Sequence, residues 1–313
     1  MSRIHDALKK AELERGVATA PPSSAGFPLG DFRGMADRPN PALAAMAAVG
    51  ANPVTGDLAS PLGFEVLAAR CVEREWKPEA GTLLFTNGNE SKRGAEEYRT
   101  LRSRLYHMRE KTPLRKLLVT SALPKEGKSF TAANLAQVMV RQHGRRALLI
   151  DADLRMPRLH EVLGTTPNPG LTDFLQGKGD EFAIMQRGAI ENLFFIPSGN
   201  PVPDAAALVG NGRLKLLLQR LEPLFDWIIL DSPPVIPVSD ASVLAQFCDG
   251  VLLVVRSNST PSDVARKARE EFPEEALVGV VLNGTSENTD PYSRYYYGEY
   301  HKETPTAGVR GGN

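Results

Sequence analysis

The apolar residues between positions 117 and 282 form short continuous runs, most of them four to six residues long. Continuous runs of this length are typical of parallel strands that are buried on both faces. Stretches with helical periodicity separate several of these runs, and strands that alternate with helices predict an α/β fold with a mostly parallel sheet and helices on both faces. The first expected strand begins at Leu117. The others are Ala147–Ile150, Leu193–Ile196, Trp227–Leu230, Gly250–Val255 and Leu277–Leu282.

One helix is expected after the first strand and ends at Val140. Two more are expected over 205–221 and 262–272. Before the region, Glu96–Met108 predicts a helix with Tyr98, Leu101, Leu105 and Met108 on one side, and 82–85 predicts an edge strand. The folded domain is therefore expected to cover 62–290, including this helix near 94–110.

The two ends of the chain have a different composition from the domain. Residues 1–16 predict an amphipathic helix, whose apolar stripe docks either on the chain's own core or on a partner or membrane surface. Residues 17–61 are rich in Ala, Pro, Gly and Ser and predict a flexible linker. Residues 291–313 predict a mobile tail that holds five of the seven tyrosines, Tyr292, Tyr295, Tyr296, Tyr297 and Tyr300. This cluster is either an aromatic docking patch or a set of phosphate acceptors.

The charge balance limits the choice of partners. Lys and Arg total 37, as do Asp and Glu, so the formal net charge is zero and gives no reason to expect nucleic-acid binding. No apolar run approaches the roughly 20 residues of a membrane-spanning helix. We therefore expect a cytoplasmic protein whose membrane contact depends on a partner or a surface helix.

A phosphate-binding loop is predicted between the first strand and its helix. The segment Ala122–Ser129 reads ALPKEGKS, a P-loop with alanine in place of the usual first glycine. Backbone N–H groups of such a loop and the start of the following helix form a cradle for phosphate oxygens. Lys128 is expected to reach the β- and γ-phosphates, and Ser129 to offer its hydroxyl to Mg²⁺. The motif predicts the P-loop NTPase fold class.

Acidic residues follow two of the predicted strands. Asp151, Asp153 and Arg155 come directly after one strand, and Asp231 ends another in the arrangement of a Walker B motif. Because the carboxyl ends of parallel strands line the ligand site, these groups are expected beside the phosphate cradle. Asn283 ends the last strand, where its amide either recognises a base or belongs to a turn. The pattern of Glu96, Arg99 and Arg102 predicts, by itself, ion pairs on a solvated helix face.

Taken together, these segments resemble the bacterial tyrosine kinases, the autokinases of capsule and exopolysaccharide synthesis. The resemblance covers about Glu96–Tyr300 and rests on SALPKEGKS, LLIDADLRMPRLH, WIILDSPP, EEYRTLR and the tyrosine cluster. It departs from the family at Lys125, where glycine is usual, which leaves the loop less free to adopt positive φ.

The resemblance implies transfer of the γ-phosphoryl group of ATP to a tyrosine of a neighbouring subunit, with Mg²⁺ as cofactor. Lys128, Asp151 and Asp153 are the implied catalytic residues, with Asp151 orienting and deprotonating the tyrosine, while Ser129 and Asp231 hold the metal. The implied ATP-binding residues are Lys125, Glu126, Gly127, Lys128, Ser129, Phe130, Arg155 and Asn283. The five tail tyrosines are the implied phosphorylation sites.

The same resemblance implies that Glu96, Arg99 and Arg102 lie at a subunit interface, in a contact that closes the subunits into a homo-oligomeric ring. It also implies a separate membrane protein of the chain-length-regulator type as activator, a peripheral position at the inner face of the cell membrane, and protein tyrosines as substrates.

Two other functions fit the Walker motifs. One is a partition- or division-site ATPase, although the signature lysine of that group would stand at position 123, where this chain has leucine. The other is a nucleotide-binding scaffold that regulates export without catalysis.

Overall fold

The computed structural model describes residues 62–85 and 93–285. The predictions for the N-terminal helix, the linker and the tyrosine-rich tail fall outside these residues. The described residues form an eight-stranded sheet in the order β1-β4-β5-β3-β6-β2-β7-β8. Neighbouring strands are parallel except β4 and β5, which are antiparallel. The predicted α/β architecture with a mostly parallel sheet is confirmed.

The central strands match the apolar runs of the sequence, and β2, β3, β5 and β6 are buried over nearly their whole length. A parallel strand covered by helices on both faces has no solvated side, which explains why its side chains do not alternate. The strands are β1 (Val72–Glu73), β2 (Lys116–Ser121), β3 (Ala147–Asp151), β4 (Gln186–Arg187), β5 (Leu193–Ile196), β6 (Trp227–Asp231), β7 (Gly250–Arg256) and β8 (Leu277–Asn283).

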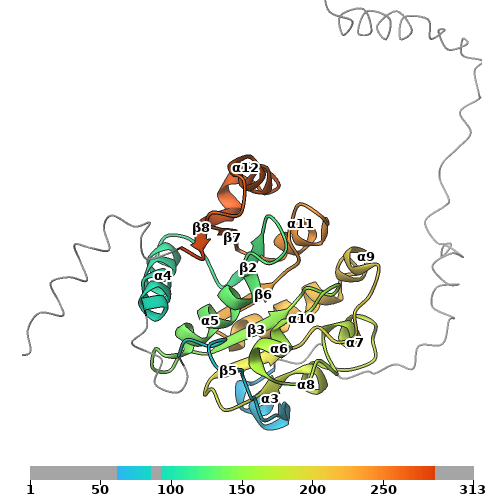
Figure 1. Cartoon of the computed structure of the whole chain (residues 1–313). Helices are drawn as coiled ribbons and strands as arrows, with labels where there is room; N and C mark the ends of the chain where they lie inside the picture. Colours follow the sequence, from blue (N-terminus) through green and yellow to red (C-terminus); the bar gives the residue numbers. More distant parts are fainter. Residues whose placement is uncertain (1–61, 86–92, 286–313) are drawn as a thin grey trace, which may run out of the picture. The chain divides into compact units, whose positions relative to one another are not determined.

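Helices cover both faces of the sheet and bury two separate hydrophobic clusters (Figure 1). One face packs against α4 (Arg93–Arg109), α5 (Lys128–Val140) and α6 (Leu159–Leu163). The other face packs against α3 (Phe64–Arg70), α7 (Leu171–Leu175), α8 (Glu181–Ile184), α9 (Ala205–Val209), α10 (Arg213–Leu221), α11 (Asp240–Ala245) and α12 (Ser262–Glu270). Short 3-10 helices, η2 (Glu222–Leu224) and η3 (Glu274–Ala276), precede β6 and β8.

Two local predictions are wrong. The helix expected over 205–221 is divided into α9 and α10, because Gly212 adopts a left-handed conformation with φ of 86°. The segment 82–85 forms turns instead of an edge strand. Its amides are bound by side chains of α5: the Leu84 and Phe85 N–H groups donate to Asn134 Oδ1 and Gln137 Oε1 at 2.7 and 3.1 Å.

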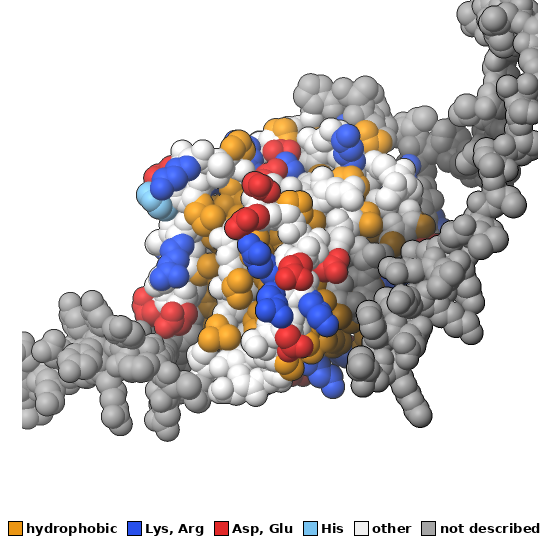
Figure 2. All heavy atoms as spheres, turned by 90° about the horizontal axis from the view of Figure 1, so that it is seen from above, with side chains coloured by type: hydrophobic (Ala, Val, Ile, Leu, Met, Phe, Trp, Pro, Cys, Tyr) orange, Lys and Arg blue, Asp and Glu red, His pale blue; other side chains and the backbone are white. Residues whose placement is uncertain are grey.

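The edge of the sheet at β8 is more exposed than the rest. Val280 and Leu282 are among the exposed large hydrophobic residues of the described chain. Figure 2, which views the end of the molecule where α12 and β8 lie in Figure 1, shows basic and acidic side chains interspersed with hydrophobic ones. No helix within the described ranges is long and apolar enough to cross a membrane.

Candidate nucleotide and phosphoryl-transfer site

The loop between β2 and α5 has the conformation of a phosphate cradle. Gly127 lies directly before α5 with φ of 95°, and Lys125 also takes a positive φ, 66°. A Cβ atom at Gly127 would lie 2.0 Å from Asn283 Nδ2, so this position requires glycine for space as well as for its backbone angle. The lysine at position 125 therefore does not prevent the left-handed conformation, which costs a non-glycine residue about 1 kcal/mol.

Glu126 holds the loop from inside the protein. Its carboxylate is buried and accepts a hydrogen bond from the Leu123 N–H at 2.7 Å and another from the Thr260 hydroxyl. Its backbone carbonyl accepts a bond from Asn283 Nδ2 at 2.8 Å. Asn283 thus contacts the P-loop itself from the end of β8, with its Oδ1 accepting the Gly284 N–H at 2.9 Å. The contribution of these residues to nucleotide binding remains a prediction.

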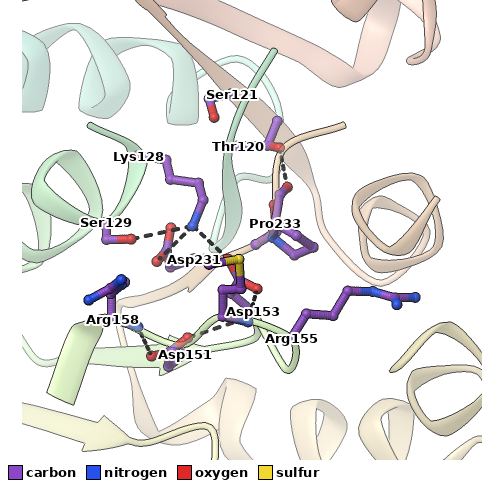
Figure 3. Close-up of polar contacts among 12 residues, drawn as sticks. Thr120, Ser121, Lys128, Ser129, Asp151, Asp153, Arg155, Arg158, Asp231 and Pro233 are labelled. Carbon is purple, nitrogen blue, oxygen red and sulfur yellow. Dashed lines mark hydrogen bonds and ion pairs between the residues drawn. The ribbon is translucent and has the colours of Figure 1, made fainter. Parts of the chain in front are cut away.

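Lys128 joins the P-loop to the two acidic strand ends (Figure 3). Its Nζ donates to Asp153 Oδ2 at 2.8 Å and lies 3.7 Å from Asp231 Oδ2 and 3.4 Å from Ser129 Oγ. The lysine is almost fully buried. Burial opposes its charge, but the carboxylates of Asp231 and Asp153 outweigh burial and raise the pKa of Lys128. The lysine is therefore held as a cation at the place where a phosphate would enter.

Asp151 ends β3 and is anchored by the backbone. Its Oδ2 accepts the N–H groups of Arg158 and Leu159 at 3.2 and 3.0 Å, and its Oδ1 accepts that of Asp153 at 3.3 Å. The carboxyl group is fully buried. Burial and the neighbouring Asp231 together raise the pKa of Asp151 well above its usual range.

Asp231 ends β6 at the same level of the sheet as Asp151, its partner across the ladder. The side chain is fully buried, and within the described residues its oxygens accept no hydrogen bond; the Lys128 ammonium forms an ion pair with Oδ2 at 3.7 Å. Burial raises the pKa of Asp231 to about 6, against the opposing effect of Lys128. Two buried oxygens without donors, beside the Ser129 hydroxyl and the cradle, fit a hard divalent cation that takes its remaining ligands from phosphates and water.

Arg155 does not point toward the phosphate cradle. Figure 3 shows its side chain directed away from Lys128, and its Nε and Nη2 bind Asp240 Oδ2 and Oδ1 at 2.6 and 3.0 Å. Asp240 is buried at the start of α11. The sequence pattern does not reveal this partner, because Asp240 lies 85 positions away and has the position of an ordinary acidic residue in a first helical turn. A role of Arg155 in binding ATP remains a prediction.

The arginines predicted for subunit assembly contact their own chain. Arg99 forms an ion pair with Glu96, and Arg102 Nη1 donates to the carbonyl of Val138 in α5 at 3.0 Å. Phe130 of α5 packs edge-to-face on Tyr98 of α4, with ring centroids 6.4 Å apart. The solvated-face interpretation of the sequence is therefore incomplete, because Arg102 fixes α4 to α5. The tail tyrosines lie outside the described residues.

A parallel sheet, a loop with left-handed residues before α5, and a buried lysine beside two strand-end carboxylates define the class of the protein. It has the P-loop NTPase fold, as the sequence predicts.

Comparison with known proteins identifies the family. No protein-family model matches the chain. The chain is 36% identical over 207 residues to the tyrosine-protein kinase YwqD of Bacillus subtilis, covering 65% of this chain and 86% of that protein. It is 31% identical over 223 residues to the tyrosine-protein kinase wzc of Salmonella typhimurium, covering 71% of this chain but only 31% of that longer protein.

A solved structure supports the same assignment. The kinase domain of the Escherichia coli tyrosine kinase ETK matches with a TM-score of 0.60 and 28% identity, covering 65% of this chain and 80% of that one. The chain therefore belongs to the bacterial tyrosine kinase family, and the resemblance inferred from its motifs is confirmed.

Proposed function

We propose that this protein is a tyrosine autokinase that transfers the γ-phosphoryl group of Mg-ATP to tail tyrosines of a neighbouring subunit, and thereby regulates exopolysaccharide synthesis or export. The observation that carries the proposal is the position of Lys128, whose Nζ lies 2.8 Å from Asp153 Oδ2 and 3.7 Å from Asp231 Oδ2 at the mouth of the P-loop. A cation in this position can exchange its carboxylate partners for phosphate oxygens.

The residues of the site divide into two groups. The P-loop amides from Lys125 to Phe130, together with Lys128, would hold the phosphates, and Asn283 would border the nucleotide from the end of β8. Ser129 and Asp231 would hold Mg²⁺, which supplies charge neutralisation on the transferred group when it is bound. Asp153 would keep Lys128 in place until phosphate enters.

Asp151 is the proposed proton acceptor. In the reaction the tyrosine oxygen bonds to the γ-phosphorus, the bond to the β–γ bridging oxygen breaks, and ADP leaves with that oxygen. The hydroxyl proton passes to Asp151. Its raised pKa reduces the mismatch with a tyrosine hydroxyl of pKa about 10, which strengthens it as a base. Its backbone hydrogen bonds fix the orientation of the carboxylate.

The acceptors in this proposal are Tyr292, Tyr295, Tyr296, Tyr297 and Tyr300. Glu96, Arg99 and Arg102 would contact the next subunit of a closed ring, which raises the effective concentration of a neighbouring tail to about the mM range. The protein would act at the inner face of the membrane, bound to a membrane activator of the chain-length-regulator type. Other protein tyrosines would be further substrates.

The decisive experiment is incubation with Mg-ATP followed by intact mass measurement. A series of phosphate additions is expected, and it should disappear in Lys128→Met. Production of ADP and phosphate without mass additions would instead identify a partition-type ATPase, and absence of both would identify a regulatory scaffold.

A matched variant tests the acceptor assignment. Replacing all five tail tyrosines by phenylalanine should remove most mass additions and leave ATP binding unchanged. Undiminished phosphorylation would show that the cluster is an aromatic docking patch.

Light scattering tests the ring. Unphosphorylated wild type should be a large closed assembly, whereas Arg99→Ala with Arg102→Ala should be smaller and still folded. If the two proteins have the same mass in solution, these arginines do not hold the ring.

A further inference from the structure

A basic cavity lies near the carboxyl end of α5, whereas the P-loop lies at the amino end of that helix. The cavity has a volume of about 280 Å³ and is lined by Phe85, Arg99, Arg102, Val138 and Arg141. It is formed by α4, by the last turn of α5 with the Arg141 that follows it, and by Phe85. None of these residues belongs to the proposed catalytic centre.

The lining is built to receive an anion. Three of its five residues are arginines, and none is acidic. Two of these guanidinium groups are anchored on backbone carbonyls, Arg102 on Val138 and Arg141 on Phe85. Arg99 is paired with Glu96, which does not line the cavity. Among the described residues, the cavity thus has three guanidinium groups and the Glu96 carboxylate paired with one of them, an excess of positive charge that suits a phosphomonoester of charge about −1.5 to −2.

An aromatic side chain completes the cavity. The Phe85 ring is buried, and the guanidinium carbons of Arg99 and Arg141 lie 5.6 and 5.9 Å from its centroid. A second cavity of about 660 Å³ shares Phe85 and Arg141 with the first and continues along Val140, Gly144 and Ile190. A ligand with a phosphate in the smaller cavity can therefore extend an aromatic ring and a peptide chain into the larger one.

We propose that this cavity binds phosphotyrosine, specifically a phosphorylated tyrosine of the 292–300 cluster. The proposal deepens the proposed autokinase function and rests on it for the source of the ligand. Arg99 and Arg102 are also the residues proposed to hold the ring, so a bound phosphate competes with the neighbouring subunit for them. Phosphorylation of the tail would then weaken the ring by occupying its arginines, beyond simple charge repulsion.

Binding of synthetic peptides to the full unphosphorylated chain tests the proposal without requiring catalysis. The probe is a fluorescent peptide of residues 289–302 with phosphotyrosine at position 296, measured by anisotropy against the same peptide without phosphate. We expect only the phosphopeptide to bind, and Arg141→Gln and Arg99→Gln each to weaken it about tenfold or more, as expected for the loss of a charged hydrogen bond.

Arg104→Gln is the matched control, because Arg104 is an exposed arginine of the same helix and does not line the cavity. Its affinity should equal that of the wild type. Equal weakening in Arg104→Gln, or no weakening in either cavity variant, would overturn the site. Competition by inorganic phosphate at the same concentration as the phosphopeptide would overturn the assignment to phosphotyrosine. A kinase-inactive but phosphopeptide-binding protein would instead overturn only the proposed function.

Discussion

β3 and β6 both end in an aspartate at the same level of the sheet, yet the two side chains have different hydrogen-bond partners. Asp151 and Asp231 are partners across the ladder, and both are fully buried. The carboxylate of Asp151 accepts three backbone N–H groups. Within the described residues that of Asp231 accepts none and has the Lys128 ammonium 3.7 Å from its Oδ2. The difference arises because the chain after β3 turns back over Asp151 into α6, while the chain after β6 continues into Pro233 and Pro234, which have no N–H to donate.

This comparison separates an anchored carboxylate from one that is available for a ligand. A buried acceptor without a donor is costly, and proteins keep such groups where a ligand completes them. Asp231 is therefore the better candidate for a metal contact, and Asp151 for a fixed orientation. Four predictions test this distinction.

The largest expected effect is on phosphoryl transfer. Asp231→Asn should lower the rate about 10³-fold, because several kcal/mol of metal-dependent stabilisation are lost, and it should raise the Mg²⁺ concentration needed for activity. Asp151→Asn should lower the rate about 10²-fold through loss of the proton acceptor, with an unchanged Mg²⁺ requirement. Radiolabelled ATP transfer over a Mg²⁺ titration measures both. An equal shift of the Mg²⁺ requirement in the two variants would contradict the comparison.

The next largest effect is on folding stability. Here we expect the larger change from replacing Asp151, whereas for the reaction rate we expect it from replacing Asp231. Asp151→Ala leaves three backbone N–H groups, two of them buried, without an acceptor and should lower the free energy of unfolding by about 3 kcal/mol. Asp231→Ala removes no backbone hydrogen bond and relieves a buried charge, but it also takes one carboxylate from the buried Lys128, which keeps Asp153 at 2.8 Å. It should therefore lower the free energy of unfolding by about 1 kcal/mol, less than Asp151→Ala does. Urea unfolding of the two variants without nucleotide gives the comparison. Greater destabilisation by Asp231→Ala would show that Asp231 is structural.

The pH dependence of stability tests the burial of Asp231 on its own. Burial raises the pKa of Asp231 to about 6, above its ordinary value of 3.8. A folded carboxyl that binds its proton more tightly than the unfolded one favours folding at low pH, and this contribution is lost as the pH rises from about 4 through about 6. The stability of Asp231→Asn relative to wild type should therefore increase over that window, by at most about 3 kcal/mol. Urea midpoints at several pH values test this, and a constant difference would disprove it.

The smallest effect is expected at a control position in the P-loop. Lys125 has a φ of 66° and is not among the residues that bind either aspartate. Lys125→Gly should relieve the left-handed conformation at some entropic cost, leaving a change of about 1 kcal/mol or less. Nucleotide affinity and the Mg²⁺ requirement should remain those of the wild type. Thermal unfolding and ATP binding measure this, and a loss of ATP affinity would show that the lysine side chain contacts the nucleotide.

The layers of the fold and the location of the candidate site could be predicted from the sequence. Apolar runs without alternation require a sheet covered on both faces, and ALPKEGKS between such a run and a helix requires a phosphate cradle at the sheet's carboxyl edge. The strand ends at Asp151 and Asp231 followed from the same patterns, because these signals are local in the chain.

Which side chains contact one another could be seen only in the folded structure. The pairing of Arg155 with Asp240, the fixing of Arg102 on α5, the division of 205–221 at Gly212 and the turn at 82–85 depend on partners or backbone angles that no periodicity encodes. The contrast between Asp151 and Asp231 has the same origin. Both aspartates follow an apolar run in the sequence, and only the path of the chain beyond each strand determines whether N–H groups reach the carboxylate.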